Sequence, residues 1–370
     1  MESKFKLLLI AGARPNFIKI ASLIEEIGKY NSIKLVLVHT GQHYDHEMSK
    51  IFFDELKIPL PDYNLKVGSK SNVLQTATMM RRLEPIILKE KPNLVVVIGD
   101  VNSTLSGALA AVKLHIPIAH IESGLRSFDK MMQEEINRRL TDHVSDILFV
   151  TEPSGIKNLL SEGILKKNIY YVGNTIIDTL IKQKKRIEKE NFVKNLDLKE
   201  KEYCLLTFHR AEAIYNKKLL KEFIAIIEEV QKSIKVVWPV HPGTKKTIKN
   251  FFPSLKIEKM ENLIVLPPVS YLKMLNLIMF ASFVMTDSGG VQEESSFLNI
   301  PCLTLRKNTE RPITEEVGTN TVVGIKKEKI LYEIGNILKG NGKKKKKINY
   351  WDGKASKRIV KAILKKFGQL

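Results

Sequence analysis

The fold is decided by residues 5–19, which have the sequence FKLLLIAGARPNFIK. Seven mostly apolar residues are followed by a glycine turn, and Pro15 then opens a stretch with helical spacing. A short apolar run bounded by a glycine indicates a buried strand, and the proline suits the first turn of a helix. This strand–turn–helix unit is typical of parallel sheets with crossover helices.

The same pattern recurs along the whole chain. Short runs rich in Val, Ile and Leu end in Gly, Asp, His or Thr, and a longer stretch with helical spacing follows each. They are residues 33–39, 94–98, 116–121, 147–150 and 169–172, and then 203–208, 234–240, 263–266, 283–286, 302–305 and 321–323. We therefore expect an α/β protein with two Rossmann-like doubly wound domains that face a central cleft.

The length of 370 residues also favours more than one domain. We place the first domain at residues 1–175 and a hinge near residues 173–178, just before a highly charged helical stretch at 179–201. The second domain then spans residues 176–351. An amphipathic helix at 352–370 is expected to cross back to the first domain.

The net charge of +20 comes from 60 basic against 40 acidic residues, and only 11 of the basic residues are arginines. Most of the excess lies after residue 150, as lysines of the charged stretch, of helix surfaces and of residues 343–347, which we interpret as an exposed loop. A nucleic-acid-binding protein would gather Arg and aromatic residues on one face. The sequence shows no such module, so no nucleic-acid partner is expected.

Cys204 and Cys302 are too few for a disulfide framework or a zinc site. Residues 1–4 show no export signal, and the most apolar stretch, 274–285, falls short of the roughly 20 residues of a membrane helix. The sequence thus predicts a cytoplasmic protein without membrane insertion.

Ligands of open parallel sheets bind beyond the carboxyl ends of the strands. The residues at these ends are unusually polar, and we expect them to line the cleft: Arg14, His39, Gln42, His43, Asp100, His120, Glu122, His209, Arg210, His241 and Asp287.

Two strand ends suggest anion sites. After the first strand, Arg14 and Lys19 flank a helix N-terminus; the alternative is a solvated turn with two surface cations. After residues 283–286, Ser288, Gly289 and Gly290 open a helix that bears Glu294, which favours a nucleotide diphosphate with its ribose; the alternative is an ordinary capped helix. Met274 belongs to a loop and helix (268–274) that suits a base-binding wall or core packing equally well.

Three acids, Asp100, Glu122 and Glu134, are candidates for acid/base chemistry if they converge on one cleft, whereas a lone acid is more often a cap or an ion-pair member. Arg138 lies four residues after Glu134 and shares its helix face. His209 and His241 are as readily structural as functional. No spacing indicates a metal site, and neither a dinucleotide motif nor a complete P-loop is present.

These motifs together resemble the non-hydrolysing UDP-N-acetylglucosamine 2-epimerase family over nearly the whole chain. The resemblance rests on residues 12–15 with Lys19, 41–43, 99–104, 120–126, 134–138, 173–175, 209–212, 241–242, 287–294 and 309–312. It implies the glycosyltransferase-B architecture and reversible inversion at C2 of UDP-GlcNAc to UDP-ManNAc, which supplies polysaccharide or glycan synthesis.

The resemblance also implies roles for single residues. Arg14, His209, Arg311 and the turn of Ser288, Gly289 and Gly290 would hold the diphosphate, with Glu294 on the ribose. Asp100, Glu122 and Glu134 would be the acid/base set with His209 beside them, and Lys19, Arg138, His241 and Met274 would support the substrate. The chemistry is elimination and re-addition of UDP and needs no cofactor or metal, and a homodimer is expected.

Departures from the family pattern and competing functions stay open. Ala213, Gly243 and Gln133 stand where Asn, Arg and Pro are common, which affects fine positioning. Gln42 and His43 match a motif that binds an allosteric second UDP-GlcNAc in bacterial members, although the following residues differ. A modified sugar, such as a UDP-2,3-diacetamido uronic acid, is the near alternative. A hydrolysing epimerase that releases ManNAc is disfavoured by Asn102-Ser103-Thr104, and a glycosyltransferase has no need for three acids.

Overall fold

The computed structural model describes residues 4–42 and 46–369, which form two compact units. Unit 1 contains the chain up to Lys182 together with Asn349–Leu370, and unit 2 contains Gln183–Ile348. The boundary at which the chain passes from unit 1 to unit 2 lies inside helix α7 (Thr175–Lys189), a few residues beyond the hinge predicted at 173–178. Both units are α/β structures with all-parallel sheets, so the predicted fold class is confirmed.

The sheet of unit 1 has seven parallel strands in the order β3-β2-β1-β4-β5-β6-β7. Their bounds are Phe5–Ala11 (β1), Ile33–His39 (β2), Tyr63–Asn64 (β3), Leu94–Ile98 (β4), Ile118–Ser123 (β5), Ile147–Val150 (β6) and Ile169–Tyr171 (β7). The order reverses between β1 and β4, which is the switch point where such sheets bind ligands. The carboxyl ends of β1, β4 and β5 therefore meet at one edge.

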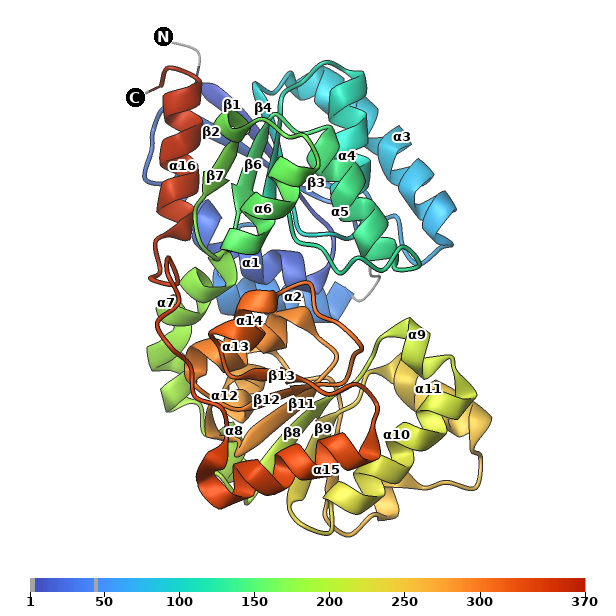
Figure 1. Cartoon of the computed structure of the whole chain (residues 1–370). Helices are drawn as coiled ribbons and strands as arrows, with labels where there is room; N and C mark the ends of the chain where they lie inside the picture. Colours follow the sequence, from blue (N-terminus) through green and yellow to red (C-terminus); the bar gives the residue numbers. More distant parts are fainter. Residues whose placement is uncertain (1–3, 43–45, 370) are drawn as a thin grey trace. The chain divides into compact units, whose positions relative to one another are not determined.

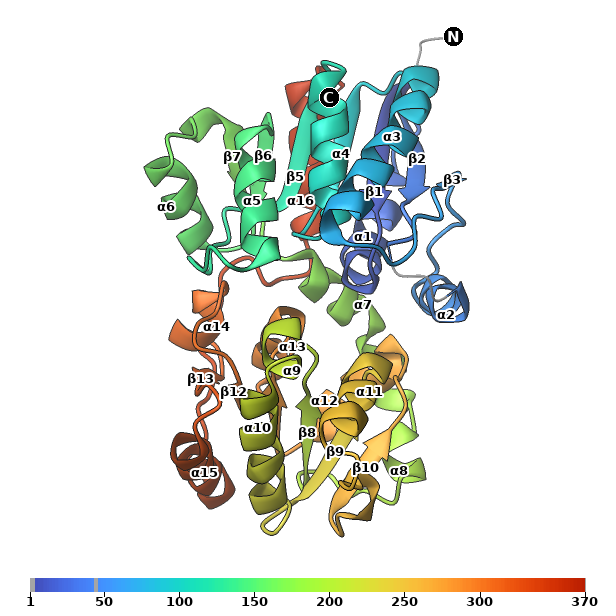
Figure 2. The same cartoon turned by 90° about the vertical axis from the view of Figure 1, so that its right-hand side faces the viewer.

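Helices cover both faces of this sheet (Figures 1 and 2). One group packs together as α1 (Arg14–Ile27), α2 (His46–Leu56) and α16 (Ala355–Lys366). The second group is α3 (Asn72–Glu90), α4 (Asn102–Lys113) and α5 (Gln133–His143), and α6 (Pro153–Ser161) follows β6. Near-continuous apolar runs in β1 and β4 are buried between the two layers, as parallel sheets require.

The last helix, α16, completes unit 1 from the far end of the chain (Figure 1). The Asp178 carboxylate accepts hydrogen bonds from the amides of Ala355 (3.1 Å) and Ser356 (2.7 Å), so a side chain of α7 caps its N-terminus. The Ser356 hydroxyl lies 2.9 Å from that of Ser22 on α1. Ile359, Val360, Ile363 and Leu364 form its buried face.

Unit 2 has six parallel strands in the order β10-β9-β8-β11-β12-β13. Their bounds are Tyr203–Thr207 (β8), Lys235–Pro239 (β9), Leu263–Leu266 (β10), Phe283–Thr286 (β11), Cys302–Thr304 (β12) and Asn320–Val322 (β13). The helices are α8 (Phe192–Asn195), α9 (Ala211–Ile214), α10 (Lys217–Val230), α11 (Pro242–Phe251), α12 (Tyr271–Phe280), α13 (Gly289–Leu298), α14 (Pro312–Glu316) and α15 (Lys327–Asn336). Its core includes the stacked rings of Phe208 and Phe223, and Phe223 also contacts Trp238.

The lysine run at 343–347 is exposed, as expected for a loop, yet it is tied to unit 2. The Lys343 ammonium donates hydrogen bonds to the carbonyl oxygens of Glu315 and Asn320. The Lys345 ammonium donates to the Phe297 carbonyl and lies 4.7 Å from the centre of that ring, and burial lowers its pKa. Two lysines of the run are therefore anchors for the chain returning to unit 1.

No helix in the described part of the chain is both long enough and apolar enough to span a membrane.

Candidate active site

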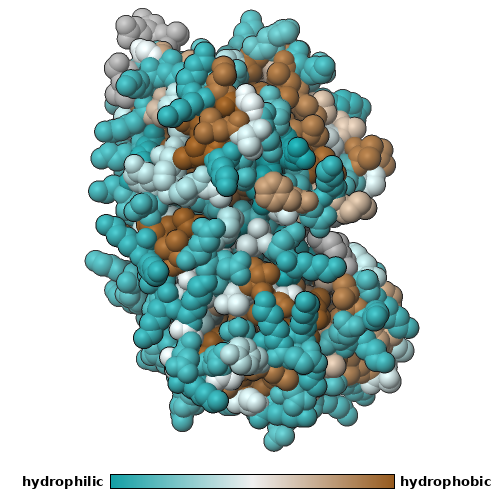
Figure 3. All heavy atoms as spheres, in the orientation of Figure 1, coloured by the Kyte–Doolittle hydropathy of each residue, from teal (hydrophilic) through white to brown (hydrophobic). Residues whose placement is uncertain are grey.

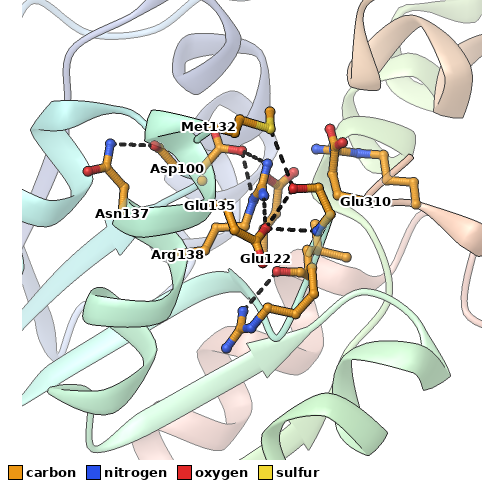
Figure 4. A network of polar contacts seen from close by, with 12 residues as sticks. Asp100, Glu122, Met132, Glu135, Asn137, Arg138 and Glu310 are labelled. Carbon is orange, nitrogen blue, oxygen red and sulfur yellow. Dashed lines mark hydrogen bonds and ion pairs between the residues drawn. The ribbon is translucent and has the colours of Figure 1, made fainter. Parts of the chain in front are cut away.

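Asp100 lies two residues after the end of β4 and is held by side chains of α5 (Figure 4). Its Oδ2 accepts hydrogen bonds from Nε (3.1 Å) and Nη2 (2.8 Å) of Arg138, and the Asn137 amide donates to its carbonyl oxygen (2.9 Å). The Asp100 side chain keeps 18% of its surface exposed, whereas Arg138 keeps 1%. The carboxylate is thus oriented by a buried cation and still accessible to a ligand.

Glu122 is the next-to-last residue of β5 and lies in the left-handed backbone region, with φ of 70°. The pairing of β5 with β6 shifts register at this residue, and the buried carboxylate forms an ion pair with buried Lys19 of α1. Gly99 makes room for this pair, because a Cβ at Gly99 would lie 3.1 Å from Lys19 Nζ. Backbone strain of this kind costs about 1–3 kcal/mol and is common at functional sites.

The acid that the structure buries beside Arg138 is Glu135, one residue after the predicted Glu134. Glu135 Oε2 lies 2.7 Å from Arg138 Nη1 and accepts hydrogen bonds from the Ser127 amide (2.8 Å) and hydroxyl (3.0 Å). Glu134 is half-buried at the start of the same helix. The sequence signal for Glu135 was present, because a spacing of three residues also places two side chains on one helix face.

The turn before α1 is tightly packed. A Cβ at Gly12 would lie 1.9 Å from the Ser103 hydroxyl oxygen, so only glycine fits there. Asn16 Oδ1 accepts from the amides of Gly12 (3.3 Å) and Ala13 (3.2 Å). The predicted anion site at this helix start therefore has two of its amides already satisfied within the protein, and half-buried Arg14 remains its candidate cation.

In unit 2, Asp287 orders the segment after β8. Its Oδ2 accepts from the amides of His209 and Arg210 (2.7 Å each), and its Oδ1 lies 3.0 Å from His209 Nδ1. Burial acts to raise the pKa of Asp287, but the charge and hydrogen bonds of His209 and the two amides lower it overall. Asp287 is therefore an anchor that presents the 49%-exposed His209 side chain.

The N-terminus of α13 lies beside Arg311. A Cβ at Gly289 would come within 2.5 Å of Arg311 Nη1, so glycine lets the guanidinium reach the helix start. Arg311 is paired with Glu310 (2.6 Å) and Glu293 (2.9 Å). Glu310 also contacts Arg306 (2.7 Å) and lies 3.8 Å from Arg210. Three guanidinium groups thus gather around one carboxylate near a helix N-terminus, an arrangement suited to anions.

Glu294, predicted at the ribose, is buried in the next turn of α13. Burial raises its pKa to about 8, although a hydrogen bond with the Tyr271 hydroxyl lowers it and the charge of Glu293 raises it further. Tyr271 at the start of α12 is itself buried, which raises its pKa. The neighbouring predicted residue Met274 is half-buried on the same helix.

The other predicted residues are distributed as follows. His241 is exposed at the start of α11, where its Nδ1 accepts the Gly243 amide (3.1 Å). The Gln42 side-chain oxygen accepts hydrogen bonds from the Ser103 amide (3.2 Å) and hydroxyl (2.7 Å), so this side chain stabilises the first turn of α4. His43 lies outside the described residues. Within the described residues, no three His, Cys, Asp or Glu side chains gather as metal ligands do.

The two Rossmann-like units have the glycosyltransferase-B fold, which the chain shares at 13% identity with UGT2 from Phytolacca americana (TM-score 0.58, covering 98% of this chain and 94% of that one). The chain belongs to the UDP-N-acetylglucosamine 2-epimerase family, whose model matches residues 25–364.

Two relatives are similar over nearly their full length. The UDP-N-acetylglucosamine 2-epimerase of Methanocaldococcus jannaschii is 45% identical over 365 residues, which are 97% of this chain and 98% of that protein. Its crystal structure in complex with UDP-GlcNAc and UDP has a TM-score of 0.92, with 97% of this chain and 99% of that one covered. The UDP-2,3-diacetamido-2,3-dideoxy-D-glucuronate 2-epimerase of Pseudomonas aeruginosa is 40% identical, over 97% of this chain and 99% of that protein.

Proposed function

We propose that the protein reversibly converts UDP-GlcNAc to UDP-ManNAc by eliminating UDP and adding it back after the C2 proton has been exchanged. The observation that carries this proposal is the pair of strand-end acids, Asp100 and Glu122, on neighbouring strands of unit 1. Each has its own buried cation, Arg138 or Lys19. Membership of the epimerase family supports the same reaction.

The chemistry explains why two acids are needed. A proton at C2 of a sugar is poorly acidic, but departure of UDP from C1 creates an oxocarbenium-like centre from which that proton is readily lost. One carboxylate takes the proton from one face of the ring, and a second group delivers a proton to the other face before UDP returns. We assign these tasks to Asp100 and Glu122, with Glu134 as the third candidate beside Glu135.

Unit 2 supplies what the departing diphosphate needs. We propose that His209, Arg311 and the turn of Ser288, Gly289 and Gly290 stabilise its charge, together with Arg14 of unit 1. Positive charge and free helix amides stabilise a leaving anion because they are already oriented when the bond breaks. Glu294 is assigned to the ribose hydroxyls, and His241 and Met274 to contacts with the rest of the nucleotide.

Proton NMR in deuterated buffer tests the reaction. The purified protein is incubated with UDP-GlcNAc, and we expect UDP-ManNAc with deuterium at C2. Free ManNAc and UDP would identify a hydrolysing enzyme instead. In the same assay we expect D100N and E122Q to slow turnover by about 100-fold or more, as loss of a general acid or base does. The control is E25Q at an exposed glutamate of α1; activity of D100N and E122Q near that of the control contradicts the assignment.

A second substrate is favoured by the similarity to the Pseudomonas aeruginosa epimerase, whose substrate is a UDP-2,3-diacetamido uronic acid. The same acids would act on C2 of either sugar. Comparing kcat/KM for the two UDP-sugars decides between them. Either product supplies activated sugar for polysaccharide or glycan synthesis, and we place the reaction in the cytoplasm.

We also propose that the protein is a homodimer and that unit 1 forms the interface. A chain of amides links Asn72 of α3, Asn102 of α4 and Asn137 of α5. Exposed apolar side chains lie next to it on α3 and α5: Val73 (78% exposed), Leu74 (61%), Ile136 (39%) and Leu140 (48%). Figure 1 labels these helices, and Figure 3 shows hydrophobic residues at the surface in the same orientation. Such patches mark contact surfaces.

Light scattering after size exclusion tests the dimer. The wild type should have twice the mass of one chain, and the double variant L74E/L140E should have the mass of one. L338E, at an exposed leucine of unit 2, is the matched control and should leave the mass unchanged. A monomeric wild type contradicts the dimer, and an unchanged mass of L74E/L140E contradicts the interface.

A further inference from the structure

A chain of four side chains, three of them fully buried, connects β5 and α5 with Glu162 at the C-terminal end of α6 in unit 1. His120 Nδ1 lies 2.7 Å from Asp142 Oδ1, and Asp142 Oδ2 lies 2.7 Å from Arg126 Nη1. Arg126 also forms a bidentate ion pair with Glu162: its Nε lies 2.8 Å from Oε1 and its Nη2 lies 2.7 Å from Oε2. The side chains of His120, Asp142 and Arg126 have no exposed surface. None of the roles proposed above uses these residues.

The hydrogen bonds determine the protonation of His120. Its Nε2 lies 2.8 Å from the Gly99 carbonyl oxygen, which only accepts, so this nitrogen carries a proton. Burial acts to raise the pKa of Asp142, but the charge and hydrogen bond of His120 and the charge of Arg126 lower it overall. Ionised Asp142 also only accepts. Both ring nitrogens therefore donate, and the chain alternates between two cations and two carboxylates.

The His120–Asp142 pair is hydrogen-bonded at one end to the turn that precedes Asp100 and at the other end to the turn that follows Glu122. The Gly99 carbonyl belongs to the residue before Asp100. The Gly124 amide, two residues after Glu122, donates to Asp142 Oδ2 at 3.0 Å. The turn after Glu122 is tightly packed, because Gly124 has φ of 78° and a Cβ there would lie 2.4 Å from the Gly155 carbonyl oxygen. One imidazolium–carboxylate pair thus connects the backbone beside Asp100 with the backbone beside Glu122.

We propose that His120 and Asp142 are positioning residues that set the spacing between Asp100 and Glu122. This inference rests on the proposed function, because the spacing is relevant only if both acids act on one sugar ring. A displacement of about 1 Å in a catalytic group reduces the rate by about 100-fold. A buried ion pair is suited to fixing this spacing, because it resists relative movement of the two turns more strongly than a neutral contact would.

The reaction has two halves that depend differently on this spacing. In the first half the C1–O bond breaks, its electron pair leaves with UDP, the C2 proton passes to one carboxylate, and a C1=C2 double bond forms. In the second half a proton is added to C2 from the opposite face and the UDP oxygen adds back to C1. An error in the spacing leaves the first half possible and impairs the second, so the unsaturated sugar and UDP escape into solution.

Two substitutions of His120 separate its contacts. Gln in H120Q places an amide donor near the position of Nε2 and keeps the contact to Gly99, whereas Asn in H120N places it near Nδ1 and keeps the contact to Asp142. We expect both variants to lower kcat by about 100-fold, with KM changed by less than about threefold. Both should release more unsaturated sugar and UDP per epimer formed than the wild type does, and H120N should release the most. NMR measures the two sugars, and a coupled assay measures UDP.

Controls separate positioning from folding. H115N at an exposed histidine should match the wild type in every measurement. E162Q keeps hydrogen bonds to Arg126 at the outer end of the chain, so it should fold and raise the release of unsaturated sugar by a few-fold. If both His120 variants unfold, E162Q alone decides.

Two outcomes would contradict different claims. If activity falls only in proportion to the folded fraction, with the wild-type ratio of unsaturated sugar to epimer, His120 and Asp142 are merely structural and the inference fails. If the wild type converts neither UDP-GlcNAc nor the UDP-diacetamido uronate, the proposed function is wrong, and the positioning role, which depends on it, is wrong as well.

Discussion

Glu294 is a carboxyl group that keeps its proton at neutral pH, because burial raises its pKa to about 8. In an unfolded chain the same group titrates near 4.5. An acid whose pKa is higher in the folded state stabilises the fold fully below pH 4.5, and this contribution is lost as the pH rises to about 8. The loss is at most about 1.4 kcal/mol per pH unit.

We therefore predict that the free energy of unfolding of the wild type, relative to that of E294Q, falls between pH 5 and pH 8. The glutamine cannot ionise, so its variant lacks this dependence, while all other titrating groups are shared. Urea unfolding of both proteins at several pH values measures the difference. Parallel pH profiles would show that Glu294 titrates normally.

Substrate binding should respond to the same proton in the opposite direction. Ionised carboxylates accept stronger hydrogen bonds from hydroxyl groups than protonated ones do. If Glu294 binds the ribose, KM for the UDP-sugar should decrease as the pH rises through about 8. The KM of E294Q should stay flat over that range, and a wild-type KM that also stays flat would remove Glu294 from the ribose site.

Candidate site residues can be predicted from the sequence where they follow a strand, and less readily where they lie inside a helix. Asp100, Glu122 and Asp287 follow apolar runs that the sequence displays directly. Inside α5, a helical spacing of three or four residues from Arg138 admits both Glu135 and Glu134, so the sequence does not distinguish them. The structure shows Glu135 as the buried partner of Arg138 and of the Ser127 amide, and the acid/base role of Glu134 stays a prediction.

At the scale of elements, the start of α13 depends on the absence of a side chain at Gly289. In G289A the new methyl group would lie 2.5 Å from Arg311 Nη1, so the guanidinium must move away from the helix start. We predict that KM for the UDP-sugar rises by about tenfold, equivalent to about 1.4 kcal/mol of binding. Steady-state kinetics and calorimetry with UDP measure this.

The matched control is G335A in α15. A Cβ at Gly335 has no atom within 4 Å, so alanine fits this helix without displacement. This variant should bind UDP as the wild type does and should be more stable by about 0.5–1 kcal/mol, since alanine favours helix over glycine. Equal KM values for G289A and G335A would show that Arg311 need not approach α13.

Strand positions followed from apolar runs, with two instructive exceptions. β3 has only two residues, Tyr63 and Asn64, too few to show a pattern. β5 begins and ends two residues later than its apolar run at 116–121, because Glu122 and Ser123 continue the strand through a change of register. A strained strand end of this kind is set by tertiary contacts, here those of Lys19 and Asp142, and not by local preference.

For the whole molecule, the net charge of +20 should act on encounter with an anionic substrate. We predict that raising the salt concentration from 50 to about 300 mM lowers kcat/KM by a few-fold and leaves kcat nearly unchanged, because salt screens long-range attraction. The control is an equal osmotic pressure of sucrose. A kcat that falls in parallel with kcat/KM would place the effect of salt on the chemistry.

The return of α16 to unit 1 has a consequence for biosynthesis. Unit 2 is one continuous segment, residues 183–348, so its last residue leaves the ribosome before α16 does. The face of α1 that α16 covers, around Ser22, stays open until residues 355–366 have been made. The unit that begins the chain is therefore the last to be completed, and a nascent chain that stalls before residue 355 exposes an apolar surface to chaperones and proteases.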